Sequence, residues 1–185
     1  MDLKIWSKTL LNIYGCLFRL TKEIDKIVLK FGLSCGGHNS FGKTYRDAEK
    51  VIELTQRKIT LINIKVLIEK CLDELDLSSC KILTLKFVDK VSSETVIKAL
   101  EFKRRTYFRK YNQAISKFAN LLLVNGFDSK NVFKLIGDET WILDIFNEYK
   151  KKELSKSGEP EISKYSIFTI AFNDFKKQKE CSFTA

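Results

Sequence analysis

Apolar residues recur at steps of three and four along residues 3–32 and again along residues 46–76, and this spacing predicts two long amphipathic helices. The first stripe consists of Ile5, Trp6, Leu10, Ile13, Tyr14, Leu17, Leu20, Ile24, Ile27, Val28 and Phe31. The second stripe consists of Ala48, Val51, Ile52, Thr55, Ile59, Ile62, Val66, Leu67, Cys71 and Leu75. Because a loop at 33–45 joins them, the two helices most simply form an antiparallel hairpin.

The second stripe is wider than a single partner helix requires. Leu61, Ile64 and Ile68 lie beside it and add further apolar surface. We expect this surplus to pack either on the following helical unit or on a second copy of the chain. A homodimer is therefore a hypothesis.

The loop contains a literal phosphate-loop pattern. Residues Gly37 to Thr44 read GHNSFGKT, which satisfies G-x4-G-K-T. A working phosphate loop follows a strand and opens a helix, whereas the residues upstream continue the helical stripe and no set of parallel strands is evident. Nucleotide binding is therefore the weaker interpretation, and we expect the lone His38 to be exposed to solvent.

Three shorter helices are predicted between residues 78 and 122, after a break at 77–79. The first has an apolar face formed by Ile82, Leu83, Phe87 and Val88. Ser92 or Ser93 can cap the second, which buries Val96, Ile97 and Leu100. After a break at 101–103, the third begins near Lys103 or Arg104. Its apolar positions are Tyr107, Phe108, Tyr111, Ile115, Phe118, Ala119 and Leu122.

Basic side chains lie between the apolar positions of the third helix. They are Lys103, Arg104, Arg105, Arg109, Lys110 and Lys117. No Asp or Glu interrupts them. Such a face repels itself in a purely structural role, whereas phosphates would relieve the repulsion and arginine can also bind guanine edges. The alternative is the solvated basic face of an ordinary helix.

A short helix, a tight turn and a basic helix form the layout of a helix-turn-helix. The stretch combines Leu83-x-Leu85-x-Phe87, Ser92-x-x-x-Val96-x-x-x-Leu100, Arg104-Arg105-Thr106-Tyr107-x-Arg109 and Ala114-x-x-x-Phe118. This pattern resembles region 4 of bacterial sigma-70-type factors and related phage late-transcription regulators. The resemblance covers about a quarter of the chain.

The resemblance implies that residues 92–100 are a supporting helix and that the next helix reads DNA, as the family's recognition helix reads the promoter −35 element. The expected base and near-base contacts are Arg104, Arg105, Tyr107 and Arg109, and Thr106 is expected to belong to the same DNA-binding helix start. The expected phosphate contacts are Lys103, Lys110, Asn112 and Lys117. This chain departs from the family where Ile97 replaces a small residue and where Glu101 replaces a common turn glycine.

Gly126 is expected to end the third helix, and two helices follow at Ser129–Ile136 and 138–152. The second of these is expected to bury Trp141, Ile142, Ile145, Phe146 and Tyr149. Beyond a linker at 155–160, the mixed apolar pattern of residues 161–175 favours a short strand or a tail that docks on a partner. We expect disorder from Lys176 onward.

Composition supports a polyanion as partner, because 33 Lys and Arg outnumber 23 Asp and Glu and give a net charge of +10. The five cysteines are odd in number and none are closely spaced, which favours reduced thiols, with Cys16 and Cys71 in the core. Without an export signal or a long apolar run, we expect a cytoplasmic protein that does not span a membrane.

These patterns predict an all-α protein with a long antiparallel helical hairpin, a helix-turn-helix unit of three helices and C-terminal helices. The expected divisions are 1–76, 77–126, 127–154 and 155–185. The expected function is a DNA-binding transcription regulator without enzymatic activity, cofactor or metal. A helical adaptor that binds an acidic protein or RNA polymerase is the first alternative, and a nucleotide-binding protein is the second.

Overall fold

The structure is a computed structural model that describes residues 2–34, 41–137, 139–155 and 164–177. These residues form helices and turns without a strand, which confirms the all-α class. The helices are α1 (Asp2–Ser34), α2 (Phe41–Asp73), α3 (Leu77–Leu83), the π-helical segment η1 (Thr84–Val88), α4 (Ser93–Ala99), α5 (Arg104–Val124), α6 (Ser129–Ile136), α7 (Thr140–Leu154) and α8 (Lys164–Lys177).

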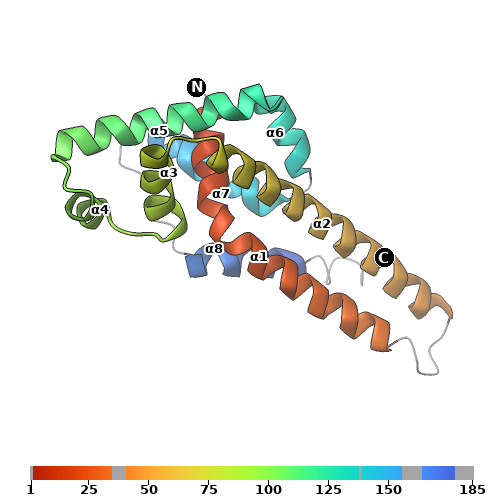
Figure 1. Ribbon diagram of the computed structural model, residues 1–185. Coiled ribbons are helices and arrows are strands. Elements are labelled where there is room, and N and C mark those ends of the chain that lie inside the picture. The colour runs from red at the N-terminus through yellow and green to blue at the C-terminus, as the bar shows by residue number, and fades with distance from the viewer. Residues whose placement is uncertain (1, 35–40, 138, 156–163, 178–185) are drawn as a thin grey trace.

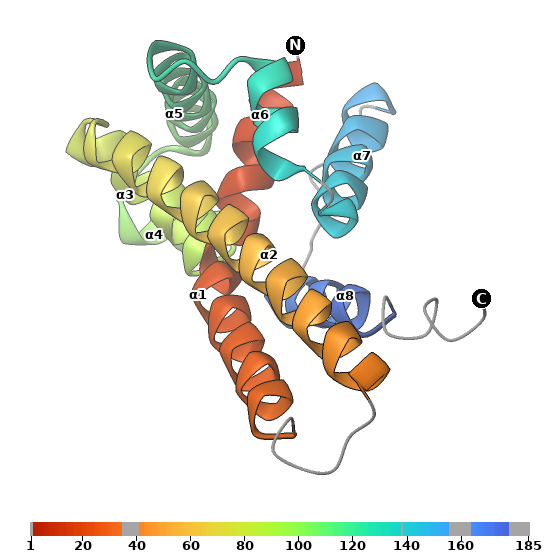
Figure 2. The same cartoon turned by 90° about the vertical axis from the view of Figure 1, so that its right-hand side faces the viewer.

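The N-terminal half of α1 is the centre of the core. It lies inside the molecule, where α1 contacts η1, α5, α6, α7 and α8, while its C-terminal half leaves the body beside α2 (Figures 1 and 2). Leu10, Leu11, Ile13 and Leu17 of α1 are completely buried. One apolar cluster therefore joins the hairpin to the helices that follow it.

The buried face of α2 differs from the predicted stripe. Leu61, Ile64 and Ile68, which were predicted to lie beside the main stripe, are completely buried within this chain. Ile52, Ile59, Ile62 and Val66 of the predicted stripe are exposed instead. The physical reason is that α1, α5 and α6 all pack against α2. Together they bury the side of α2 that lies opposite the exposed isoleucines and Val66.

Two helix starts lie earlier than predicted. α2 begins at Phe41, so Gly42, Lys43 and Thr44 of the phosphate-loop pattern belong to its first turn. The preceding element is α1, a helix that runs to Ser34 rather than the strand that a phosphate loop requires. The other half of the pattern, including His38, lies outside the described residues.

α3 begins at Leu77, where a break was predicted. Its N-cap is Asp76, whose side chain accepts a hydrogen bond from the Ser79 amide at 3.1 Å. An aspartate at this position satisfies one of the amides that the first helical turn leaves unpaired. Asp76 thus starts the helix that Leu77, Ser78 and Ser79 were expected to interrupt.

The prediction of a short strand within residues 161–175 was wrong for the described part, because Lys164–Lys177 form the helix α8. Ile167, Ala171 and Phe175 recur at every fourth position and are buried. α8 packs against α1 and α7 of the same chain. On the α1 side, the Arg19 guanidinium lies 4.0 Å from the centre of the Phe168 ring. The helical period was hidden by the aromatic and β-branched residues between these positions.

The C-terminal helices are further held by a partly buried ion network. Arg57 of α2 donates to Glu139 at 2.9 and 2.8 Å and to Asp174 of α8 at 2.8 Å. Glu139 precedes α7 and also accepts from the Trp141 indole at 2.7 Å. Thr140 donates to the other oxygen of Asp174 at 3.1 Å. The network fixes α2, α7 and α8 to one another.

The aromatic core of α7 was predicted correctly for Trp141, Ile142, Ile145 and Tyr149, which are buried. Phe146 is only half-buried and stacks on Trp6, with ring centres 3.9 Å apart. Cys16 and Cys71 are free, buried thiols, and burial raises the pKa of Cys16 to about 12 and that of Cys71 to about 11. Within the described residues, none of the helices combines the length and apolarity that crossing a bilayer requires.

We expect Arg57→Leu to lower the free energy of unfolding by about 3 kcal/mol, because it leaves the buried Glu139 carboxylate without its cation. Lys58→Leu is the matched control, since Lys58 pairs with Asp25 at a partly exposed site and should cost less than about 1 kcal/mol. Urea denaturation followed by circular dichroism measures both. Equal losses in the two variants would contradict a structural role for the network.

Candidate nucleic-acid interface

The segment η1–α4–α5 places a short helix and a long basic helix on either side of a tight turn. Ser92 caps α4, and its hydroxyl accepts from the Thr95 amide at 3.2 Å. α5 begins at Arg104 and contains 21 residues, none of them acidic. Figure 1 shows α4 and the start of α5 at one end of the molecule, far from the tip of the α1–α2 hairpin.

The turn between α4 and α5 has the backbone conformation that glycine adopts readily. Glu101 has a φ of 51°, in the left-handed region. Its amide bonds to the Lys98 carbonyl at 3.2 Å, and the Phe102 amide bonds to the Ile97 carbonyl at 3.1 Å. These two bonds form a Schellman motif, which usually has glycine at the left-handed position. Gly126 occupies the equivalent position after α5, with a φ of 84°.

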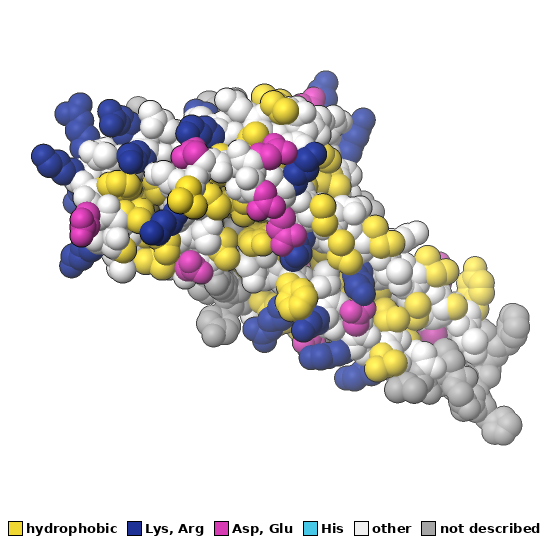
Figure 3. Space-filling model, viewed as in Figure 1, with side chains coloured by type: hydrophobic (Ala, Val, Ile, Leu, Met, Phe, Trp, Pro, Cys, Tyr) yellow, Lys and Arg dark blue, Asp and Glu magenta, His cyan; other side chains and the backbone are white. Residues whose placement is uncertain are grey.

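Four basic side chains at the start of α5 are exposed: Lys103, Arg104, Arg105 and Arg109. Among the described residues, no carboxylate lies within ion-pairing distance of these four side chains. Figure 3 shows dark blue side chains gathered at this end, whereas basic and acidic groups alternate over the middle of the molecule. The patch therefore presents positive charge that the protein itself does not neutralise.

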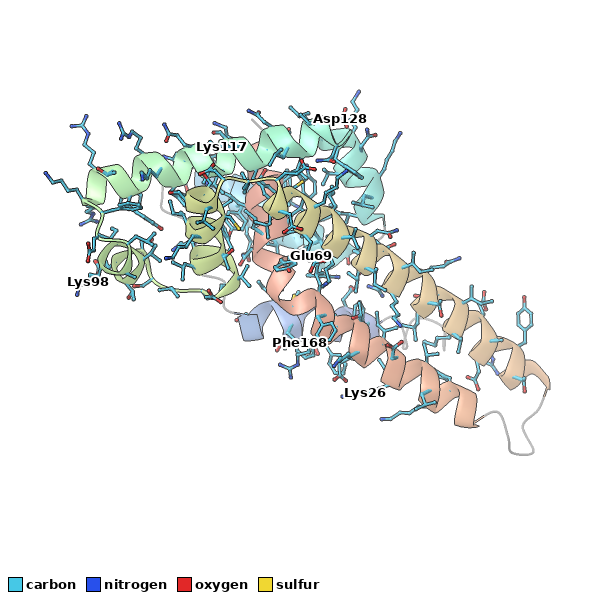
Figure 4. All side chains as sticks on the ribbon, viewed as in Figure 1. Lys26, Glu69, Lys98, Lys117, Asp128 and Phe168 are labelled. Atoms are coloured by element: carbon cyan, nitrogen blue, oxygen red, sulfur yellow. The ribbon has the colours of Figure 1, made fainter. Side chains whose placement is uncertain are left out.

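Lys98 extends this basic end from the neighbouring helix. It is exposed on α4 and lies at the outer edge of the molecule in Figure 4. Lys98 was not among the predicted contacts, because the apolar face of residues 92–100 was the only feature of this segment that predicted its role. Its position one turn before the α4–α5 corner was the signal that could have identified it.

The tyrosine predicted to contact bases lies in the core instead. Tyr107 is 1% exposed and stacks on Tyr111, with ring centres 6.1 Å apart. Its ring also meets the edge of Phe108 at 5.2 Å. Tyr107 lies on the face of α5 that also buries Ala114 and Phe118. Tyr107 therefore anchors the helix, and Thr106 beside it is half-buried.

The predicted phosphate contacts divide into free and engaged side chains. Asn112 is exposed, whereas the Lys110 ammonium lies 4.2 Å from the centre of the Phe102 ring. Lys117 donates to Asp76 at 2.5 Å. Lys117 thus connects α5 to the start of α3, and a phosphate there would have to compete with a carboxylate.

A family described as "Protein of unknown function (DUF1492)" matches residues 47–119, which is less than half of the chain. The matched residues run from the first part of α2 through α3, η1 and α4 and into α5. No curated protein and no solved structure matches the chain.

We expect Glu101→Gly to raise the free energy of unfolding by about 0.5–1 kcal/mol, because glycine adopts the left-handed conformation without the steric cost of a side chain. Glu101→Ala is the control, since it removes the charge but keeps a Cβ atom and therefore the steric cost of the left-handed conformation. Chemical denaturation of both variants measures the difference. A loss of stability in Glu101→Gly would contradict the left-handed turn.

We expect Asp76→Ala to lower stability near neutral pH by about 1 kcal/mol through loss of the α3 cap. The hydrogen bonds from Lys117 and Ser79 lower the pKa of Asp76 from 3.8 to about 2. A lowered pKa means that the charged form stabilises the fold above pH 3.8 and that this contribution disappears as the pH falls toward about 2.

Stability measured against pH for wild type and Asp76→Ala should therefore converge across that acidic range. Asp76→Asn separates the two roles of the side chain, because it keeps a capping oxygen but loses the charge that binds Lys117. We expect its loss to be smaller than that of Asp76→Ala. Curves that stay parallel down to pH 2 would refute the assignment.

Proposed function

We propose that the protein is a DNA-binding transcription regulator, in which α4, the turn at Glu101 and α5 act as a helix-turn-helix. The observation that carries the proposal is the exposed group of Arg104, Arg105 and Arg109 at the start of α5, without carboxylate partners among the described residues. The left-handed turn at Glu101 adds support, because it supplies the sharp corner that the sequence resemblance requires.

The geometry suits a helix that enters the major groove by its N-terminal end. Because α5 has 21 residues, it is about 30 Å long at 1.5 Å per residue. Its C-terminal half is held in the core through Phe118 and Leu122. Its first two turns lie at the edge of the molecule with the arginines exposed. A recognition helix uses its first residues to contact base edges while its body stays packed.

The side chains on this end have distinct roles in the proposal. Arg104, Arg105 and Arg109 make base and near-base contacts, since guanidinium groups bind guanine bidentately. Lys103, Asn112 and Lys98 contact phosphates on either side. The helix dipole strengthens phosphate binding near the first turn of α5, because its unpaired amides point toward the anion.

The start of α5 groups three exposed arginines without a carboxylate partner among the described residues, whereas several lysines elsewhere on the described surface are paired. Lys26, Lys58, Lys65 and Lys117 each lie within 4 Å of a carboxylate. A general excess of lysine would spread over the surface, whereas these arginines are concentrated on one helix end. That contrast favours a specific polyanion site over an ordinary solvated face.

The test measures binding to random-sequence duplex DNA by fluorescence anisotropy at several salt concentrations. We expect Arg104→Ala/Arg105→Ala to weaken binding by at least about tenfold and to reduce the salt slope by about 2, since about 0.9 counterion is released per phosphate contact. Lys151→Ala/Lys152→Ala is the matched control, because it removes the same charge from exposed residues of α7.

Equal losses in the two double variants would mean that binding follows net charge rather than this helix end. Wild-type protein that does not bind DNA at low salt would reject the proposal and favour the helical adaptor. Circular dichroism of both variants checks that the fold is retained. Selection from random DNA would then identify the preferred sequence.

A further inference from the structure

The exposed face of α2 carries an apolar seam with a heptad period. Its members are Tyr45, Ala48, Ile52, Thr55, Ile59, Ile62 and Val66. Successive members are three and four residues apart, and all seven are exposed. Ile52, Ile59 and Val66 each leave more than half of their surface accessible, at 59, 52 and 56%. This spacing keeps one stripe of a helix facing a partner helix over about three heptads.

The seam is separate from the face that holds α2 in the fold. The buried side of α2 consists of Leu54, Leu61, Ile64, Leu67, Ile68, Cys71 and Leu72. Those residues contact α1, α5 and α6, while the seam lies on the opposite side of the helix. Figure 3 shows yellow side chains along the α1–α2 arm, where the seam lies. Its exposure is therefore not needed for packing within the chain.

The flanks of the seam are compatible with an identical helix. No charged residue occupies any of its seven positions. Beside it, Gln56, Asn63 and Val51 are uncharged, and Glu49 is an exposed carboxylate. The flanking Lys58 and Lys65 are already paired within the chain, with Asp25 and Glu69. Two copies could meet along this face without placing unpaired like charges opposite each other.

We infer that α2 forms a two-helix antiparallel coiled coil with α2 of a second copy of this chain. A two-fold interface is self-complementary, because each residue meets a partner residue that meets it in return. Knobs-into-holes packing requires the same repeat on both helices, and a second copy provides that repeat automatically. The seam is distant from α4 and the start of α5 (Figure 1), so the inference does not rest on the proposed DNA binding.

The antiparallel direction follows from the position of the positively charged body of the molecule relative to α2. Figure 1 shows the body of the molecule at the C-terminal end of α2 and the hairpin tip at the other. Parallel pairing would place the bodies of two chains, each of net charge +10, side by side. It would also bring Glu69, the next heptad position, against itself. Antiparallel pairing places the bodies at opposite ends, with Ile52 facing Ile62 and Thr55 facing Ile59 of the other copy.

Sedimentation equilibrium over a range of protein concentrations tests the association. We expect wild type to approach twice its chain mass of 21.5 kDa, and Ile59→Glu to weaken dimerisation by about tenfold or more because it buries a charge in the seam. Val124→Glu is the matched control, since Val124 is an exposed apolar residue near the end of α5 and should leave dimerisation unchanged. Helicity measured by circular dichroism confirms that each variant is folded.

A charge pair tests the direction. Ile52→Glu alone and Ile62→Lys alone should each weaken the dimer. Combined in one chain, the new carboxylate and the new ammonium face each other across the antiparallel interface, so the double variant should dimerise more tightly than either single variant. In a parallel dimer, like charges would meet and the double variant would be the weakest.

The outcomes decide the inference. A wild type that stays monomeric at the highest soluble concentration overturns it and leaves the seam to a different partner. Dimers that Ile59→Glu does not weaken place the contact elsewhere, which also overturns it. A double variant weaker than both single variants overturns the antiparallel arrangement.

Discussion

The structure depends on the burial of the first half of α1. Leu10, Leu11, Ile13 and Leu17 contribute no accessible surface, and six other elements use this helix as their common contact. Burying one such side chain contributes about 1.5–3 kcal/mol, so a change in this helix affects elements that do not touch one another. The hairpin and the basic helix are therefore parts of one packed structure rather than independent modules.

Charge is distributed unevenly on this frame. The partly buried pairs around Arg57 hold helices together, whereas the arginines at the start of α5 are left to solvent. Concentrated positive charge costs stability through mutual repulsion. This repulsion acts at the start of α5. The burial of Tyr107, Tyr111 and Phe118 and the stacking of the two tyrosine rings hold α5 in the core and offset the repulsion.

The sequence was sufficient to predict the all-α class and the starts of α4 and α5, because Ser92 and the charge change at Arg104 are local signals. It was insufficient where tertiary contacts choose between faces. Ile52 and Leu61 are equally apolar, and only the positions of α1, α5 and α6 decide which is buried. Tyr107 is similar, since an amphipathic ring at a helix start suits either a core or a groove. The exposed arginines were predictable because no apolar alternative competes for that face.

The attachment of α8 has a practical meaning for the boundaries of the folded unit. Phe168 lies against Arg19 near the middle of the first helix, and Asp174 completes the carboxylate pair around Arg57. A chain shortened to end before residue 164 would uncover the side of α1 that α8 covers and leave the Arg57 guanidinium with Glu139 as its single acidic partner. α8 thus completes the core that α1 forms, and these two helices belong to one folded unit although they lie far apart in the sequence.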